Sequence, residues 1–326
     1  MSSEMPHGLV CGFDIDAGGQ ATELHGEDIF QPIPEGAWRW LHFDKNDDDA
    51  ISWLVEKSGL RPAIRNVLIA PETRPRLKIV DEDEVLVLRG VNLNPHAHAE
   101  DMISIRLSVE KNRIISSRKI KLMAIDALRK AFAEGTGPQT IGDFIVDLAE
   151  GLTERVGPVV SELLEESDQL EEFGSSMDMR VLRERISQLR HKLIPLRRYL
   201  RPQKDALKAL ISAPLDWMTD RQRLRLRDTH DQLIRYLEDL DAARDRADVV
   251  QDWLQADLSD RTNRVMLILS VVTAIFLPLG LISGLLGMNV SGIPGAETPY
   301  AFLIVIVLMC LIGVLLLWVF RYFKII

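Results

Sequence analysis

Residues 265–286 read VMLILSVVTAIFLPLGLISGLL and residues 301–320 read AFLIVIVLMCLIGVLLLWVF, without a charged side chain in either run. Each run provides about 20 residues, or about 30 Å of helix, which matches the hydrocarbon core of a bilayer. One such run also occurs as the buried core helix of a soluble protein, but two in succession are not expected there. The sequence therefore predicts two transmembrane helices, over 265–287 and 301–320.

Charged residues beside the two runs predict how the spans are oriented. Arg261 and Arg264 precede the first run, and Arg321 and Lys324 follow the second, whereas the connecting loop 288–300 has neither lysine nor arginine. Lysine and arginine next to transmembrane helices concentrate on the cytoplasmic side. We therefore expect both termini in the cytoplasm and the loop outside the cell.

Nearly all of the charge lies before the first span. The chain has 39 basic and 48 acidic residues, for a formal net charge of −9, and only Glu297, Arg321 and Lys324 are charged after residue 264. An acidic segment repels the phosphate backbone, so nucleic acid is excluded as a partner. We expect the lipid bilayer and metal cations as partners instead.

An α/β domain is expected over residues 1–135. Short apolar and β-branched runs bounded by turn residues predict strands over 9–13, 38–43, 77–80, 85–93, 102–110 and 113–118. Helical patterns are expected over 47–58, 61–69 and 121–134. Residues 81–84 and 110–112 are predicted to form tight hairpin turns.

Residues 136–264 are expected to form a helical cytoplasmic region. Helices are predicted over about 140–172 and 177–211, the second with kinks at Pro195 and Pro202. Neither proline nor glycine then occurs between Thr219, an expected N-cap, and Pro278. A long stalk helix is therefore expected to run without a break into the first span. Its regular apolar spacing favours bundling, and hence an oligomer.

The first span ends in Gly287-Met288-Asn289, followed by Gly-Ile-Pro-Gly over 292–295. At this point the chain resembles the CorA metal-ion transporter superfamily, whose hallmark is a Gly-Met-Asn tripeptide after the first of two C-terminal spans. It looks most similar to the ZntB zinc transporter branch, by the segments ETRPR (72–76), EGTGP (134–138), LRRY (196–199) and Trp217-Met218. Some ZntB members have valine in the middle of the tripeptide, and that position does not separate zinc from magnesium transporters.

This resemblance implies a funnel-shaped homopentamer whose first span lines a central pore. It also implies that Asn289 rings the external entrance, with Gly287 and Met288 completing the selectivity filter. Five asparagine carbonyl oxygens can accept hydrogen bonds from the hydration water of a divalent cation. From the residues alone, Asn289 is equally consistent with a simple helix C-cap. The resemblance favours the ring.

Residues one helical turn apart, counted inward from Asn289, are candidates for the pore surface. This count gives Gly280, Leu277, Thr273, Leu269 or Ser270, and Met266. The pore stripe of the superfamily falls on Gly280, Leu277, Leu269, Met266 and Asn263. An aliphatic stripe with this spacing is also typical of ordinary helix packing, and around an axis it can serve as a hydrophobic gate.

Acidic residues outside the spans are the remaining candidates. Neither span has an aspartate, glutamate or histidine, so a proton-coupled mechanism would need a titrating group elsewhere. Glu297 in the outer loop is one candidate, and it could also attract cations to the entrance. Asp245, Asp252 and Asp260 on the stalk are candidates for the inner funnel, although aspartates on a helix are commonly solvated surface charges.

The sequence therefore predicts a transporter of Zn²⁺ in a bacterial inner membrane, with uptake as the expected direction, and proton coupling left open. No enzyme activity and no resident cofactor are expected, because no hydrolase, kinase or oxidoreductase motif is found. Three alternatives stay open: a magnesium, cobalt or nickel channel of the CorA type, zinc efflux, and a membrane-anchored sensor or scaffold.

Overall fold

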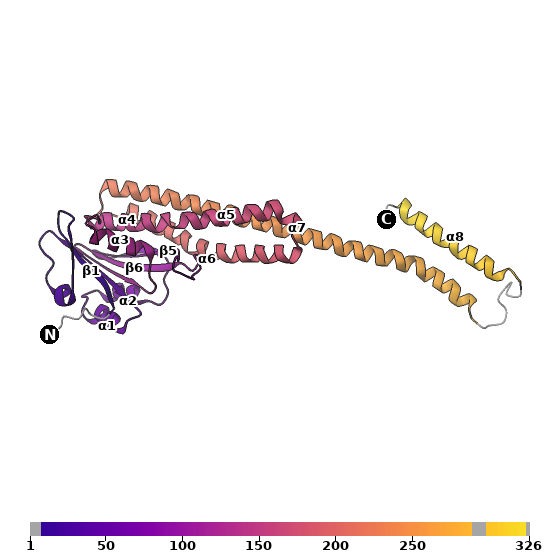
Figure 1. Ribbon diagram of the computed structural model, residues 1–326, viewed down its shortest axis with the longest axis horizontal. Coiled ribbons are helices and arrows are strands. Elements are labelled where there is room, and N and C mark those ends of the chain that lie inside the picture. Colours follow the sequence, from indigo (N-terminus) through magenta and orange to yellow (C-terminus); the bar gives the residue numbers. More distant parts are fainter. Residues whose placement is uncertain (1–7, 289–297, 324–326) are drawn as a thin grey trace. The chain divides into compact units, whose positions relative to one another are not determined.

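The structure is a computed structural model that describes residues 8–288 and 298–323 (Figure 1). The chain divides into two compact units, Met1–Gln251 and Asp252–Ile326. The first unit contains a sheet and the helices around it, and the second contains the two apolar helical segments.

Seven strands form one mixed sheet in the order β2-β1-β3-β7-β6-β5-β4. Their bounds are β1 (Leu9–Ile15), β2 (Ala21–Glu23), β3 (Trp38–Asp44), β4 (Arg76–Val80), β5 (Asp83–Gly90), β6 (Ile103–Glu110) and β7 (Arg113–Arg118). Among these strands β3 and β7 pair in parallel, and the other neighbours pair antiparallel. The six predicted strands are confirmed. Strand β2 was not predicted, because three half-exposed residues give no alternating pattern.

Both predicted hairpin turns are confirmed. Val80 pairs with Asp83 and Glu110 pairs with Arg113, so two residues form each turn. The left-handed backbone of Asp81, with φ of 59°, is one that aspartate tolerates better than most residues with a side chain.

Helices cover both faces of the sheet (Figure 1). On one face, α1 (Asp48–Glu56) and α2 (Pro62–Ile69) bury Leu54, Ile64 and Leu68 against sheet residues that include Val87 and Ile115. On the other face, α3 (Met123–Ala133) and α4 (Ile141–Glu154) place two aromatic rings over Trp40. The ring centroids of Phe132 and Phe144 lie 5.6 and 4.9 Å from that of Trp40. Helix α4 therefore rests on a rigid platform.

The remaining helices are α5 (Val156–Phe173), α6 (Met179–Ser212), α7 (Asp220–Leu286) and α8 (Ala301–Tyr322), with 3₁₀ turns η1 (Gly26–Phe30) and η2 (Gly174–Ser176). The helical region predicted over 140–172 is confirmed, and it divides at Arg155, where α4 ends and α5 begins. Pro158 explains the break, since it has no N–H to donate to Glu154 and fits the first turn of a new helix. Arg155 also donates from Nη1 to the carbonyl of Gly151 at 2.6 Å.

Candidate functional site

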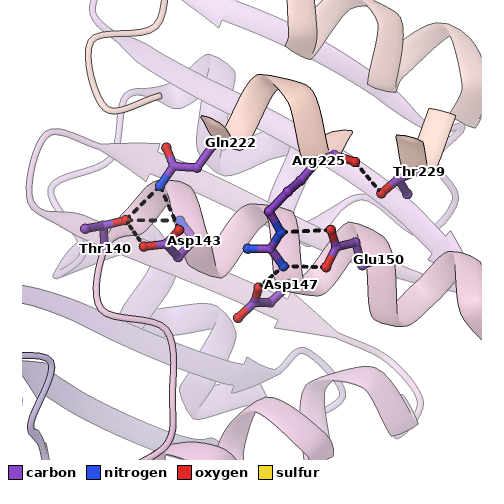
Figure 2. Close-up of polar contacts among 7 residues, drawn as sticks. All are labelled: Thr140, Asp143, Asp147, Glu150, Gln222, Arg225 and Thr229. Carbon is purple, nitrogen blue, oxygen red and sulfur yellow. Dashed lines mark hydrogen bonds and ion pairs between the residues drawn. The ribbon is translucent and has the colours of Figure 1, made fainter. Parts of the chain in front are cut away.

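Helix α7 is the candidate functional element, and hydrogen bonds with α4 fix its first turn (Figure 2). The amide of Gln222 donates to Thr219 Oγ1 at 3.4 Å, and the amide of Thr219 donates to Gln222 Oε1 at 2.9 Å. This reciprocal pair is a capping box, which confirms the predicted N-cap at Thr219. Gln222 Nε2 also donates to Thr140 Oγ1 at 3.1 Å and to Asp143 Oδ1 at 2.9 Å.

One turn further along α7, Arg225 pairs with two acidic residues of α4 (Figure 2). Its Nε lies 3.0 Å from Glu150 Oε1, and its Nη2 lies 2.5 Å from Glu150 Oε2 and 2.8 Å from Asp147 Oδ1. The hydrogen bonds that Arg225 donates to Glu150 raise the pKa of the guanidinium further above its ordinary value. We call this set of residues the α4–α7 clamp: Thr140, Asp143, Asp147, Glu150, Gln222 and Arg225.

The α4–α7 clamp was not predicted from the sequence. Its partners lie 75 to 82 positions apart in the chain, and local patterns do not report such pairs. A partial signal was present, because Asp143, Asp147 and Glu150 are spaced by four and three residues and so share one face of a helix. That acidic face predicts a basic partner without identifying it.

The rest of the stalk packs on its neighbours through an apolar face and ion pairs. The regularly spaced apolar residues of the predicted stalk are buried from Leu226 to Leu254, whereas Leu258 is 45% exposed. Ion pairs flank this face on the α5 and α6 side. Asp241 pairs with Arg197 and Arg201, Asp248 with Arg190, and Arg246 with Asp168.

Asp245, Asp252 and Asp260 differ from Asp241, Asp248 and Asp257 of α7, which form ion pairs. All three are exposed, and none forms an ion pair with any residue that the structure describes. With 3.6 residues per turn they lie on one face, opposite the buried Ala243, Ala247 and Val250 on the stalk. These three carboxylates therefore have no basic partner among the residues that the structure describes.

Beyond the stalk, α7 has the composition of a membrane span. Both α7 and α8 contain a window that is long and apolar enough to cross a bilayer, and neither window is buried. The predicted pore residues lie within about one third of the circumference of α7. This set comprises Asn263, Met266, Leu269, Thr273, Leu277 and Gly280, all of them exposed. Counted at 3.6 residues per turn, Asp252 lies on the same face of α7 and Asp260 lies beside it.

The end of this span is described only in part. Helix α7 ends at Leu286, and the amide of Gly287 still donates to the carbonyl of Ser283 at 2.9 Å. Met288 is 50% exposed. Asn289 and Glu297, the two predicted groups of the outer entrance, lie outside the described residues.

Two buried titratable groups of the sheet lie apart from this helix. Burial lowers the pKa of His42 to about 3 and raises that of Cys11 to about 12, so the imidazole is neutral and the thiol is protonated. His42 Nδ1 lies 2.8 Å from Ser116 Oγ. In the described residues no group of three or more His, Cys, Asp or Glu side chains is arranged to hold a metal ion.

Comparison with known proteins identifies the family. Residues 35–322 match the family described as "CorA-like Mg2+ transporter protein". The chain is 35% identical over 322 residues to the "Divalent cation transporter CmaX" of Pseudomonas aeruginosa, with 96% of each chain covered. It is 31% identical over 321 residues to the "Zinc transport protein ZntB" of Pectobacterium carotovorum subsp. carotovorum, covering 98% of this chain and 97% of that protein.

The fold agrees with the sequence match. The solved structure of full-length CmaX superimposes with a TM-score of 0.81 at 32% identity, over 99% of this chain and all of that chain. The predicted fold class is thereby confirmed: an α/β domain, a long helix and two C-terminal apolar helices. The predicted resemblance to the ZntB branch is confirmed by relatives of that name. The chain is therefore a member of the CorA-like family of divalent-cation transporters.

Proposed function

We propose that this protein carries Zn²⁺ into a bacterial cell across the inner membrane, through a central pore formed by a homopentamer. The observation that carries the proposal is the composition of one face of α7, on which exposed aspartates without an ion-pair partner among the described residues precede an uncharged stripe inside an apolar span. Such a face attracts cations at its acidic end and provides an uncharged path across the membrane. Membership in a family of divalent-cation transporters supports it.

An assembly is needed because one α7 and one α8 cannot enclose a hydrophilic path. In the proposed assembly the α7 helices surround the axis with Asn263, Met266, Leu269, Thr273, Leu277 and Gly280 toward the pore. The apolar members form a constriction that a hydrated ion crosses only when the helices separate. Gly280 has no side chain, so the pore is wider at this residue, on the side of the constriction nearer to the outer entrance.

The outer entrance is proposed from the sequence. Spans over 265–287 and 301–320 with both termini in the cytoplasm put the loop 288–300 outside, because Arg261, Arg264 and Arg321 flank the spans. The filter is then Gly287-Met288-Asn289, with the Asn289 carbonyl oxygens contacting the hydration water of the ion. Glu297 would add negative charge at the same end. Proton coupling, if present, uses a carboxylate outside the spans.

Zinc is proposed over other divalent ions because several similar proteins are named as zinc transporters. A magnesium, cobalt or nickel channel is the second candidate, and the description of the family as Mg²⁺ transporters favours it. Oxygen ligands that touch only hydration water discriminate weakly between these ions. Competition between ions decides between the two candidates.

The test is zinc flux into liposomes that contain the purified full-length protein, followed with a trapped zinc-sensitive dye. Wild type is compared with Asn289→Ala, with and without a proton gradient and with excess magnesium. Asn46→Ala, which changes an amide on the surface of the sheet domain, is the matched control.

Flux that persists in excess magnesium, that Asn289→Ala abolishes and that Asn46→Ala retains supports the proposal. Flux that magnesium abolishes assigns the protein to the magnesium-type channel. An intact oligomer without flux in either direction would contradict transport and favour a membrane-anchored sensor or scaffold. Outward flux alone would show efflux.

A further inference from the structure

Helix α7 has a shallow hollow on its surface in the middle of the apolar span. The hollow is lined by Leu269, Ser270, Thr273, Ala274, Leu277 and Pro278. Three of these, Leu269, Thr273 and Leu277, belong to the face proposed to line the pore. The hollow is therefore on the conduction side of the helix, and two of its six lining residues carry hydroxyl groups.

Pro278 lies inside α7, and this changes the backbone of the hollow. A proline has no N–H, so the carbonyl of Ala274, four residues earlier, lacks the amide that would bond it in a regular helix. A proline ring inside a helix also crowds the carbonyl four residues earlier, which weakens the regular hydrogen bonding at that turn. Within an apolar span the Ala274 oxygen is thus a strong acceptor that needs a donor.

The hydroxyl of Thr273 adds a second acceptor. Its Oγ1 donates to the carbonyl of Leu269 at 2.8 Å, so its hydrogen is already engaged by the backbone. The lone pairs of Oγ1 remain available to accept hydrogen bonds. Water bound to a cation turns its oxygen toward the ion and its hydrogens outward, and such a shell requires acceptors.

We infer that this hollow is a relay site for a hydrated divalent cation between the apolar constrictions at Leu269 and Leu277. The Ala274 carbonyl and the Thr273 hydroxyl accept hydrogen bonds from the water around the ion. Repeated around the axis, they offset part of the cost of taking the hydrated ion into the apolar span. This inference rests on the proposed function and adds the residues that lower the barrier inside the membrane.

Two substitutions test the two acceptors in the liposome assay. Thr273→Val replaces the hydroxyl with a methyl group of similar size, and Pro278→Gly supplies the missing amide without stiffening the helix. Each is expected to lower zinc flux roughly threefold to tenfold, as expected when one hydrogen bond to the transition state is lost. Thr273→Ser, which keeps the oxygen, is expected to retain flux. Ser283→Ala removes a hydroxyl of the same span outside the hollow and is the matched control.

The outcomes separate this inference from the proposed function. If wild type conducts and Asn289→Ala does not, but Thr273→Val or Pro278→Gly conducts at the wild-type rate, the relay site is wrong and the transporter stands. If wild type itself does not conduct, the proposed function fails first. Size-exclusion chromatography of each variant in detergent establishes that a fall in flux is not a loss of assembly.

A second measurement addresses hydration directly. In a Cys310→Ser background, Thr273→Cys is expected to react with a small charged methanethiosulfonate reagent, and Zn²⁺ is expected to slow that reaction. Cys11 is buried and does not compete for the reagent. A Thr273→Cys protein that reacts only with membrane-soluble reagents would show that helix packing, and not water, fills the hollow, and this would overturn the inference.

Discussion

Arg225 of α7 contacts both carboxylate oxygens of Glu150 on α4, through Nε at 3.0 Å and Nη2 at 2.5 Å. Two parallel hydrogen bonds between a guanidinium and a carboxylate fix an angle as well as a distance. Because α4 also packs on the aromatic face of the sheet, this pair connects the stalk through α4 to the core of the sheet. The α4–α7 clamp is the natural place to test how the stalk is held.

Arg225→Met should lower the stability of the protein. The substitution keeps the apolar stem but leaves Asp147 and Glu150 without their cation. Since the guanidinium is partly exposed, we expect a loss of about 1–2 kcal/mol, or a fall of roughly 2–8 °C in apparent melting temperature. Scanning fluorimetry of the detergent-solubilised chain measures this. Arg227→Met on the exposed side of α7 is the control, and equal effects of the two variants would contradict the clamp.

Gly142→Ala should disturb the clamp through contact alone. A Cβ at this position would lie 2.3 Å from Oε1 of Gln222, so that side chain must move and lose its bonds to Thr140 and Asp143. In the Gln222→Ala background the three atoms nearest to that Cβ are removed, and the same change should stabilise α4 by about 1 kcal/mol through helix propensity. A double-mutant cycle should therefore give a coupling of about 1 kcal/mol or more. If the two substitutions change the free energy of unfolding additively, position 142 and the Gln222 side chain do not interact.

Acid should destabilise the sheet domain through His42. Burial lowers the pKa of His42 from an ordinary 6.5 to about 3, so below pH 6.5 the unfolded chain binds a proton that the folded chain does not. The stabilisation is complete above pH 6.5 and is lost as the pH falls toward 3, with a slope of at most about 1.4 kcal/mol per pH unit. His42→Asn retains a partner for Ser116 and should show a shallower fall in melting temperature between pH 6.5 and 4.5. Parallel pH profiles would contradict this assignment.

The three free aspartates should speed conduction by electrostatics. Changing Asp245, Asp252 and Asp260 to asparagine should lower zinc flux roughly twofold to fivefold at low ionic strength, because the inner face of the pore loses its negative potential. The difference should largely vanish near 1 M salt, where the screening length is about 3 Å. The matched control changes Glu23, Glu56 and Glu82 to glutamine, which alters the net charge equally on the exposed surface of the sheet domain. Equal flux in the two triple variants would assign the aspartates to ordinary surface charge.

Local rules were sufficient for much of the fold. Asp47 was expected near a helix start, and its Oδ1 accepts from the amides of Asp49 and Ala50 at the N-cap of α1. The strands were predicted from short apolar and β-branched runs, and the hairpin turns from the turn-forming residues between them. The break at Arg155 was missed although Pro158 marked it, because a proline three residues into a helix reads equally as an interior residue or as part of a first turn.

Part of the candidate site could be predicted from the sequence, and part of it could not. The spans and the stripe on α7 could be predicted from composition and helical period, since both are properties of one segment. The α4–α7 clamp could not, because Arg225 acquires its partners only when the fold brings α4 beside it. The pairing of Asp248 could be predicted only in part: its contact with Arg244 follows from the i,i+4 spacing on one helix, whereas its contact with Arg190 of α6 depends on the fold.

The parallel pairing of β3 with β7 has a consequence for biosynthesis. Leu41 pairs with Ile115, so the N-terminal strands cannot complete the sheet until the chain has been made past β7. All seven strands are nevertheless translated before α6, α7 and α8. Domains of a nascent chain generally fold in the order in which they are made. The sheet can thus be finished while the hydrophobic segments still await insertion, and a substitution that delays strand pairing would appear as lower yield in the membrane rather than as a defect in flux.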